Sequence, residues 1–354
     1  MSPYEKMLAV VFALILLGEL YTVTQPSLVV KTSVSVSDIT YLDGKKAEIT
    51  YSVDQGTYPN TLAVALLRSY QLFSDRHIYT YYDENYPSSM VALASWLGII
   101  DHLDENLRLK GYVGSTEVVN AARLRELMLQ EYDSVVIIPS GVFPETVHTR
   151  ESSLVKQYLE MGGIIIWIGD YFAAFLGKYG NMVNGSSTEN PGFEAQQEIL
   201  GYTISNASSL ESAGNASLFS HSLNLRYPGI QRGILVDEVV KHGGLVLGMT
   251  NGDRTSIGLV PVGNGYLVIF GGKVTTARSE FGEDIVASDI ANILLSGVAY
   301  SNGEVTYHML ERNSVRNQTM SFDLNDSQIK ALVLLVISSD AYSYFFFRKL
   351  ITLN

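Results

Sequence analysis

Two kinds of hydrophobic pattern divide the chain, and the longer patterned stretch runs from about residue 57 to residue 300. Short apolar runs there are separated by segments in which apolar residues recur every three or four positions. Strands that alternate with helices in this way form a parallel sheet with helices on both faces. The predicted fold class is therefore α/β, with a doubly wound and mainly parallel sheet.

The clearest predicted strands, 134–139 and 163–169, are apolar throughout, as expected for parallel strands buried on both faces. A helix is expected to begin near Pro87, with one apolar face that carries Met90, Leu93, Trp96, Leu97 and Ile100. Further strands are expected at 61–67, 107–113, 245–248, 256–261 and 266–271, and further helices after Ser115, over 149–161 and over 281–296.

Stretches of alternating polarity flank this region, and they predict strands without helices. The first flank covers residues 26–56 and the second covers residues 301–354. Short isolated hairpins are only marginally stable. The simplest packing therefore joins both flanks in one small β-sandwich-like domain, with the α/β domain of residues 57–300 inserted between them.

Residues 7–23 form a dense apolar run with one charged side chain, Glu19. At about 1.5 Å per residue, about 17 helical residues are the lower limit for crossing a bilayer core. Three interpretations stay open for residues 1–25: an uncleaved membrane anchor, a cleaved signal peptide and a helix of a soluble protein. No small-residue cleavage site follows Leu20, which favours a single-pass anchor. The first two interpretations both place the remaining chain outside the cytoplasm.

Five Asn-x-Ser/Thr sequons agree with an extracytoplasmic location. Four of them lie in polar, Ser-rich stretches, where an exposed glycosylation acceptor is expected, although such stretches also produce sequons by chance. The combination of 22 Tyr, no Cys and several sequons resembles archaeal surface proteins. The candidate glycosylation sites are Asn184, Asn206, Asn215, Asn317 and Asn325.

Charge and composition exclude several function classes. The chain has 24 Lys and Arg against 36 Asp and Glu, a net charge of −12, whereas nucleic-acid binders need a basic surface. The absence of Cys excludes disulfides, thiolate metal sites and cysteine nucleophiles. The six His show no H-x-x-x-H pair, and no glycine motif has the spacing of a nucleotide-binding loop, so we expect no metal and no cofactor.

Three segments carry a family resemblance: 132–141 (YDSVVIIPSG), 154–170 (LVKQYLEMGGIIIWIGD) and 263–272 (GNGYLVIFGG). They resemble the class I glutamine amidotransferase-like superfamily, whose fold is flavodoxin-like, over about residues 61–298. Active members carry a Cys nucleophile after the strand that corresponds to 163–169 and a His-x-Glu pair after a late strand. Here Asp170 holds the first position, and Gly272-Lys273-Val274 follows the late strand. The resemblance therefore implies a degenerate, non-catalytic domain that serves in binding.

Candidate catalytic residues are few. Ligands of doubly wound sheets bind beyond the carboxyl ends of the strands, where Asp170 and Ser140 are expected. Asp170 has two interpretations: a nucleophile, base or metal ligand, or a helix N-cap. Ser140 is a nucleophile candidate or a turn residue, and Pro139-Ser140-Gly141 does not match G-x-S-x-G.

An aromatic stretch, residues 69–87, is the best candidate binding surface, because rings with polar groups suit sugar or protein recognition. Its other interpretation is a loop packed over the sheet by its own tyrosines. The candidate binding residues are Tyr79, Tyr81, Tyr82 and Tyr171.

Together these features predict a membrane-tethered extracytoplasmic protein that binds other envelope proteins or glycans, or assembles the envelope, without enzymatic activity. Two alternatives stay open. One is a surface hydrolase that acts on glycans or peptides through Asp170. The other is a solute-capturing component of an envelope complex.

Overall fold

The computed structural model describes residues 33–42, 46–54, 60–71, 73–110, 112–114, 116–149, 151–184, 193–204, 225–227, 234–250, 254–274, 282–296, 298–300, 306–309, 315–323, 331–339 and 344–352. The predicted anchor (1–25) and three predicted glycosylation sites, Asn206, Asn215 and Asn325, lie outside these residues. No helix within the described ranges is both long and apolar enough to cross a membrane. The chain divides into two compact units. The larger one falls within residues 65–307, 324–335 and 348–354, and the smaller one falls within residues 1–64, 308–323 and 336–347.

The larger unit is built on an eight-stranded sheet in the order β11-β13-β14-β8-β6-β4-β5, with β12 beside β13. Its parallel strands are β4 (His77–Tyr81), β5 (Thr116–Val119), β6 (Ser134–Ile138), β8 (Ile164–Gly169) and β14 (Gly265–Gly271). Numbered in chain order, these five stand in the order 2-1-3-4-5 across the sheet. β11 (Ile234–Leu235), β12 (Leu245–Thr250) and β13 (Arg254–Val262) extend it by antiparallel pairing. This mixed α/β unit with a mainly parallel sheet confirms the predicted class.

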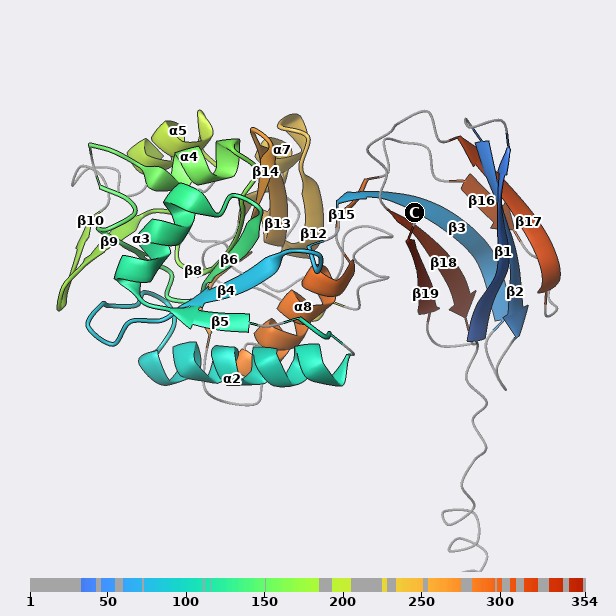
Figure 1. The fold of residues 1–354 in the computed structure, drawn as a ribbon, viewed down its shortest axis with the longest axis horizontal. Helices are drawn as coiled ribbons and strands as arrows, with labels where there is room; N and C mark the ends of the chain where they lie inside the picture. Colours follow the sequence, from blue (N-terminus) through green and yellow to red (C-terminus); the bar gives the residue numbers. More distant parts are fainter. Residues whose placement is uncertain are drawn as a thin grey trace, which may run out of the picture. The chain divides into compact units, whose positions relative to one another are not determined.

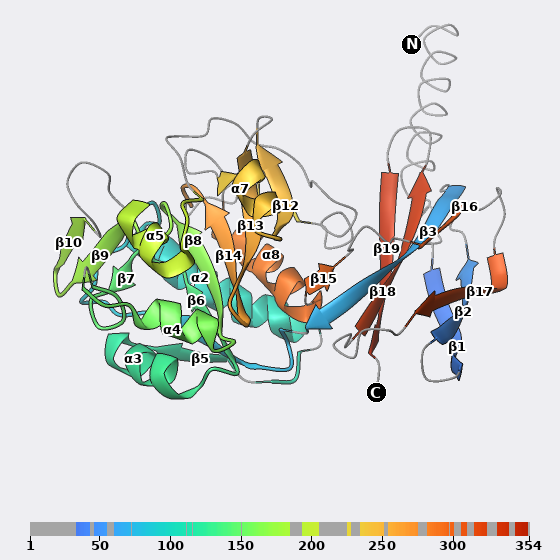
Figure 2. The same cartoon turned by 90° about the horizontal axis from the view of Figure 1, so that it is seen from above.

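Helices cover both faces of this sheet (Figures 1 and 2). One face carries α2 (Leu93–Leu109) and α8 (Glu283–Ser296), which pack against each other. The other face carries α3 (Ala121–Gln130), α4 (Leu154–Glu160) and α5 (Phe193–Leu200), and α7 (Val236–Lys241) packs on β12 and β13. Every residue of β6 and β8 is buried, because both faces of these central strands are covered.

The strands predicted at 134–139, 163–169, 245–248, 256–261 and 266–271 are confirmed, and so are helices within 149–161 and 281–296. The strand predicted at 107–113 is wrong, because Leu107 and Leu109 belong to the end of α2. The next strand is β5, and α3 after it begins at Ala121 with Asn120 as its N-cap, whose side chain accepts a hydrogen bond from the Arg123 amide. Ser115 lies outside the described residues.

The start of α2 and part of its buried face differ from the prediction, although Trp96 is buried as expected. The helix begins at Leu93, several residues after Pro87. Leu93 and Leu97 are exposed, whereas Trp96 is fully buried and its Nε1 donates a hydrogen bond to the Tyr81 carbonyl at 2.7 Å. Trp96 therefore sets which face of the helix meets the sheet, and the two leucines lie beside that face.

Strands from the N-terminal and C-terminal parts of the chain pair in two further sheets. One sheet has the order β1-β2-β17, with β1 (Ser33–Leu42), β2 (Lys46–Asp54) and β17 (Val315–Asp323) antiparallel. Another has the order β15-β3-β18-β19, with β16 beside β3. Its strands are β15 (Val298–Tyr300), β3 (Asn60–Gln71), β18 (Ala331–Ser339), β19 (Tyr344–Thr352) and β16 (Thr306–Met309).

The strand predicted at 61–67 therefore exists, as β3, but in the five-stranded sheet rather than in the parallel one. The first parallel strand is β4, which lies inside the aromatic stretch expected to be a loop. The limits 26–56, 57–300 and 301–354, and the β-sandwich-like packing of the flanks, stay predictions. The larger unit also contains a small three-stranded sheet in the order β10-β9-β7. It comprises β7 (Phe143–Pro144), β9 (Phe175–Lys178) and β10 (Asn181–Asn184).

Candidate functional site

The carboxyl ends of the parallel strands, where a ligand is expected, are crossed by the chain itself. We call Ser88–Val91 the covering segment, because it runs from the loop after β4 across the ends of β6, β8 and β14. The Ser89 amide donates a hydrogen bond to the Ser140 carbonyl after β6 at 2.7 Å. Val91 forms a parallel bridge with Val274 after β14, and the Val274 amide donates to the Met90 carbonyl at 3.0 Å.

Asp170 joins the covering segment to the end of β8. Its side chain is buried, with 2% of the residue exposed. Its Oδ2 accepts a hydrogen bond from the Ser89 hydroxyl at 2.6 Å, and its Oδ1 accepts one from the Tyr171 amide at 2.7 Å. The chain after Asp170 turns into β9 and not into a helix, so the N-cap interpretation is wrong. Asp170 instead holds two loops together.

Ser140 lies at the same edge of the sheet and is fully buried. Its hydroxyl donates a hydrogen bond to the carbonyl of Val142 at 2.8 Å, within its own turn. This is the geometry of a turn residue rather than of a nucleophile that faces a substrate. Asp170 and Ser140 are thus near neighbours in the fold, as the sequence predicted, but both serve local structure.

Two glycines make room for the covering segment. Gly141 has a φ of +65°, and a Cβ atom there would lie 2.3 Å from the Ser89 carbonyl oxygen. Gly169 has a φ of +118°, and its Cβ would lie 2.8 Å from the same oxygen. Met90 itself has a φ of +61°, a left-handed conformation that costs about 1–2 kcal/mol for a residue with a side chain. The covering segment therefore contains a strained residue, Met90, and packs against Gly141 and Gly169, where a side chain would collide with it.

The four candidate binding tyrosines separate into two groups. Tyr79 and Tyr81 are 6% and 1% exposed, because they belong to β4 and not to a loop, so their assignment to a binding surface is wrong. Tyr81 packs on Trp96 with ring centroids 5.3 Å apart. Tyr82 and Tyr171 are half-buried at the carboxyl ends of β4 and β8.

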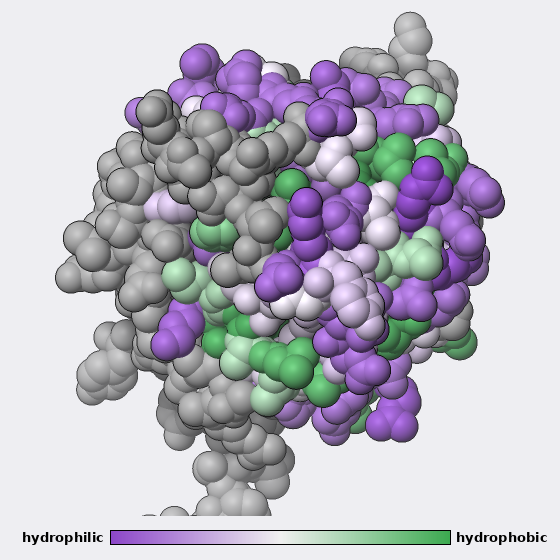
Figure 3. Space-filling view, turned by 90° about the vertical axis from the view of Figure 1, so that its left-hand side faces the viewer, coloured by the Kyte–Doolittle hydropathy of each residue, from purple (hydrophilic) through white to green (hydrophobic). Residues whose placement is uncertain are grey.

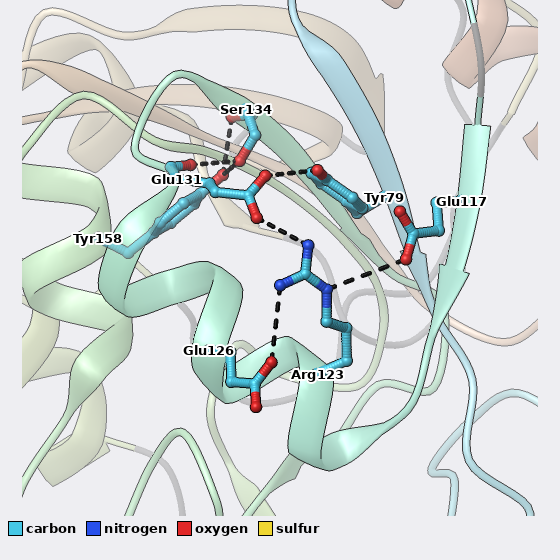
Figure 4. Close-up of polar contacts among 7 residues, drawn as sticks. All are labelled: Tyr79, Glu117, Arg123, Glu126, Glu131, Ser134 and Tyr158. Atoms are coloured by element: carbon cyan, nitrogen blue, oxygen red, sulfur yellow. Dashed lines mark hydrogen bonds and ion pairs between the residues drawn. The ribbon is translucent and has the colours of Figure 1, made fainter.

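Tyr79 belongs to a polar cluster that sequence analysis missed (Figure 4). Its hydroxyl donates to Glu131 Oε2 at 2.5 Å, and Arg123 donates to Glu131 Oε1 at 2.7 Å. Burial and the Glu131 carboxylate raise the pKa of Tyr79 to about 12, and the hydrogen bond from Tyr79 lowers the pKa of Glu131. Glu117 and Glu126 lie 3.9 Å and 3.6 Å from Arg123. The cluster joins α3 to the sheet. In the sequence, only the i, i+3 spacing of Arg123 and Glu126 indicates any of its contacts.

Comparisons with known proteins assign no family. No family model matches the chain. The uncharacterized protein MJECL34 of Methanocaldococcus jannaschii is 26% identical over 107 residues, which cover 27% of this chain and 34% of that protein. The chain thus matches about a third of the length of this relative.

Similar solved structures share little sequence with the chain. Cytoplasmic protein STM1381 from Salmonella typhimurium has a TM-score of 0.36 and 12% identity, and covers 62% of this chain and 98% of its own. Exo-beta-1,4-mannosidase Op5Man5 from an Opitutaceae bacterium has a TM-score of 0.35 and 8% identity, and the match covers 64% of this chain and 37% of that chain. Cytoplasmic protein STM3548 from S. typhimurium has a TM-score of 0.35 and 12% identity, and the match covers 77% of this chain and 97% of that chain. TM-scores at this level do not establish a common fold.

Among the described residues, no group of three His, Asp or Glu side chains is arranged to hold a metal ion. Of the predicted glycosylation sites, Asn184 ends β10, and Asn317 is an exposed residue of β17.

Two further buried titratable side chains belong to the larger unit. His148 is 1% exposed, its ring lies edge-on to Phe143, and neither ring nitrogen has a hydrogen-bond partner. Asp289 of α8 is fully buried, and its Oδ2 accepts hydrogen bonds from the amides of Arg226 and Tyr227 at 2.9 Å and 2.7 Å. Burial lowers the pKa of His148 to about 4 and raises the pKa of Asp289 to about 7. Each is therefore neutral over much of the acidic range.

The His148→Phe substitution is expected to remove a loss of stability in acid. The folded protein binds fewer protons than the unfolded chain between the unfolded pKa of 6.5 and about 4, so His148 costs stability as the pH falls through this window. His148 can lower the free energy of unfolding in acid by at most about 3 kcal/mol. Urea unfolding at pH 7 and pH 4 measures it: the variant should lose less stability than the wild type, and equal losses would contradict the assignment.

Proposed function

We propose that this protein is a non-catalytic, membrane-tethered component of the cell envelope that binds other envelope proteins or glycans, outside the cytoplasm. In this proposal, its larger unit is a degenerate relative of the class I glutamine amidotransferase-like superfamily. The strand order 2-1-3-4-5 supports the relationship to this superfamily, because flavodoxin-like sheets have this order. The apolar run 7–23 and the five sequons support the location outside the cytoplasm.

The covering segment is the observation that carries the non-catalytic assignment. A general base or nucleophile must come within hydrogen-bond distance of its substrate. Asp170 is buried, and both of its carboxylate oxygens already accept hydrogen bonds from protein groups. Ser140 is buried as well and bonded within its turn. This arrangement favours binding over hydrolysis through Asp170.

The end of the unit that lies over the covered strand ends offers aromatic side chains for binding. Tyr179, in the turn between β9 and β10, is 70% exposed, and its ring lies edge-on to Tyr86 with centroids 6.4 Å apart. The Gly180 amide donates to the Asn85 carbonyl at 2.7 Å, which holds the two loops together. On this side, hydrophobic residues form small separate groups among hydrophilic ones (Figure 3). Tyrosines in such surroundings are typical of protein and sugar recognition.

Capture of envelope material by the purified chain tests the proposal, with three single variants. Asp170→Asn can keep both hydrogen bonds, because its side-chain oxygen can accept from the Tyr171 amide and its Nδ2 can donate to the Ser89 hydroxyl, so capture should be unchanged. Tyr179→Ala should reduce capture about tenfold, the effect of losing a central aromatic contact. Met161→Ala, which removes an exposed apolar side chain after α4, is the matched control and should have no effect.

The same variants distinguish the proposal from the hydrolase alternative. Each is assayed for release of sugars or peptides from the envelope material. A hydrolytic activity that the wild type has and a folded Asp170→Asn variant lacks would overturn the non-catalytic assignment. Equal capture by Tyr179→Ala and the wild type would move the binding surface elsewhere.

A further inference from the structure

The strand β17 forms one edge of the sheet β1-β2-β17, and within the described residues it pairs only with β2. Its register with β2 changes between Val315, opposite Val53, and Gln318, opposite Tyr51. Two residues, Arg316 and Asn317, therefore face a single residue of β2, which is the arrangement of a β-bulge. An unpaired edge can template pairing with a strand of another molecule, and native proteins protect such edges.

Asn317 is the exposed point of this bulge. Its φ is +52°, a left-handed conformation that Asn adopts more readily than most residues. The Asn317 amide donates to the Ser52 hydroxyl of β2 at 3.0 Å, so the backbone is fixed to the sheet while the side chain is exposed. Thr319, two residues on, is also exposed. The acceptor amide and the hydroxyl of the sequon Asn317-Gln318-Thr319 are thus both accessible.

We propose that Asn317 carries an N-linked oligosaccharide and that this glycan prevents other strands from pairing with β17. The inference rests on the extracytoplasmic location in the proposed function. The donor is an oligosaccharide linked to a lipid phosphate. A bond forms between Asn317 Nδ2 and C1 of the first sugar, the C1–O bond to the lipid phosphate breaks, and the proton lost from Nδ2 passes to the released phosphate. No oxidant or reductant is needed.

Mass spectrometry of the full chain from its native membranes tests the attachment. Peptide-N-glycosidase should release a glycan from the peptide that contains Asn317 and leave Asp at that position. Asn317→Gln and Thr319→Ala should each abolish this glycan, whereas Thr319→Ser should keep it, because the sequon accepts either hydroxyl. A wild-type chain that is unmodified at Asn317 overturns the inference.

Two controls separate this result from the proposed function. If Asn317 is unmodified while another sequon carries a glycan, the site assignment fails and the extracytoplasmic location stands. If no sequon is modified and protease added outside intact cells leaves the chain uncut, the location fails together with the inference.

The role of the glycan is tested by self-association in sedimentation velocity. Asn317→Gln, which loses the glycan, should associate at least twofold more than the glycosylated wild type at equal concentration. Asn317→Lys also loses the glycan but places a charge on the edge strand, which protects edges in other proteins. It should therefore associate as little as the wild type. Equal association of Asn317→Gln and the wild type overturns the protective role.

Discussion

The Gly141→Ala substitution is expected to lower the free energy of unfolding of the larger unit by about 3 kcal/mol or more. Alanine at a φ of +65° costs about 1–2 kcal/mol. Its Cβ would also lie 2.3 Å from the Ser89 carbonyl oxygen, and overfilling a packed site costs about 1–3 kcal/mol. Relief of this collision requires the covering segment to leave the strand ends, with loss of the buried hydrogen bond between Ser89 and Asp170.

Gly180→Ala is the matched control for this prediction. Gly180 has a similar φ of +73°, but a Cβ there would meet no atom within 4 Å. Only the backbone cost of about 1–2 kcal/mol should appear. Urea unfolding followed by tryptophan fluorescence reports on this unit, because both tryptophans, Trp96 and Trp167, are buried in it. Equal destabilisation by the two substitutions would mean that the covering segment can move away from Gly141 without lowering the free energy of unfolding.

The Asp289→Asn substitution is expected to change how stability depends on pH. The pKa of Asp289 is raised from 3.8 to about 7, so the folded protein binds more protons than the unfolded chain between these values. Stability therefore falls as the pH rises through this window. The variant cannot ionise, and its stability relative to the wild type should increase from pH 4 to pH 8 by at most about 4 kcal/mol.

The direction of this change distinguishes Asp289 from other titratable groups. The charges of Arg226 and Lys110 act on Asp289 from other elements and lower its pKa, as do the hydrogen bonds from the Arg226 and Tyr227 amides, but burial outweighs them. His148→Phe should show the opposite pH dependence to Asp289→Asn when each is compared with the wild type. Urea unfolding over pH 4 to 8 measures both variants. A constant difference between Asp289→Asn and the wild type would show that Asp289 has an ordinary pKa in the folded protein.

The buried parallel strands were the most predictable part of the fold. Most residues in the runs at 134–139 and 163–169 are Val, Ile or Trp, and strands buried on both faces favour such continuous apolar sequences. The first parallel strand was missed because His77–Tyr81 has a polar atom on four of its five side chains. Those polar atoms are accommodated by tertiary contacts, such as the Tyr79–Glu131 hydrogen bond, that no local pattern reveals.

The placement of β3 was wrong for a different reason. Its apolar run predicts a strand, but hydrophobicity does not say which sheet a strand joins. The end of α2 was read as a strand because Leu107 and Leu109 alternate with charged residues, which fits both periods over a short window.

At the candidate site, the rule for carboxyl ends of parallel strands correctly brought Asp170 and Ser140 to one edge. The covering segment escaped prediction because Pro87-Ser88-Ser89 has the sequence of a helix start. What fixes that segment is distant in the chain: Ser89 binds Asp170, 81 residues away, and fits against Gly141 and Gly169. Contacts between residues so far apart in the chain leave no local sequence pattern.

The pairing of β17 with β2 has a consequence for the order of events during synthesis. Ser321 of β17 hydrogen-bonds to Glu48 of β2, and these residues are 273 positions apart. The ribosome must therefore deliver most of the chain before β2 can meet this neighbour, whereas the parallel strands of the larger unit are made within a shorter stretch. Contacts this distant form late and slowly. A nascent chain should thus acquire its helix-covered sheet first, and a truncation before residue 315 should leave the β1–β2 hairpin as a target for chaperones.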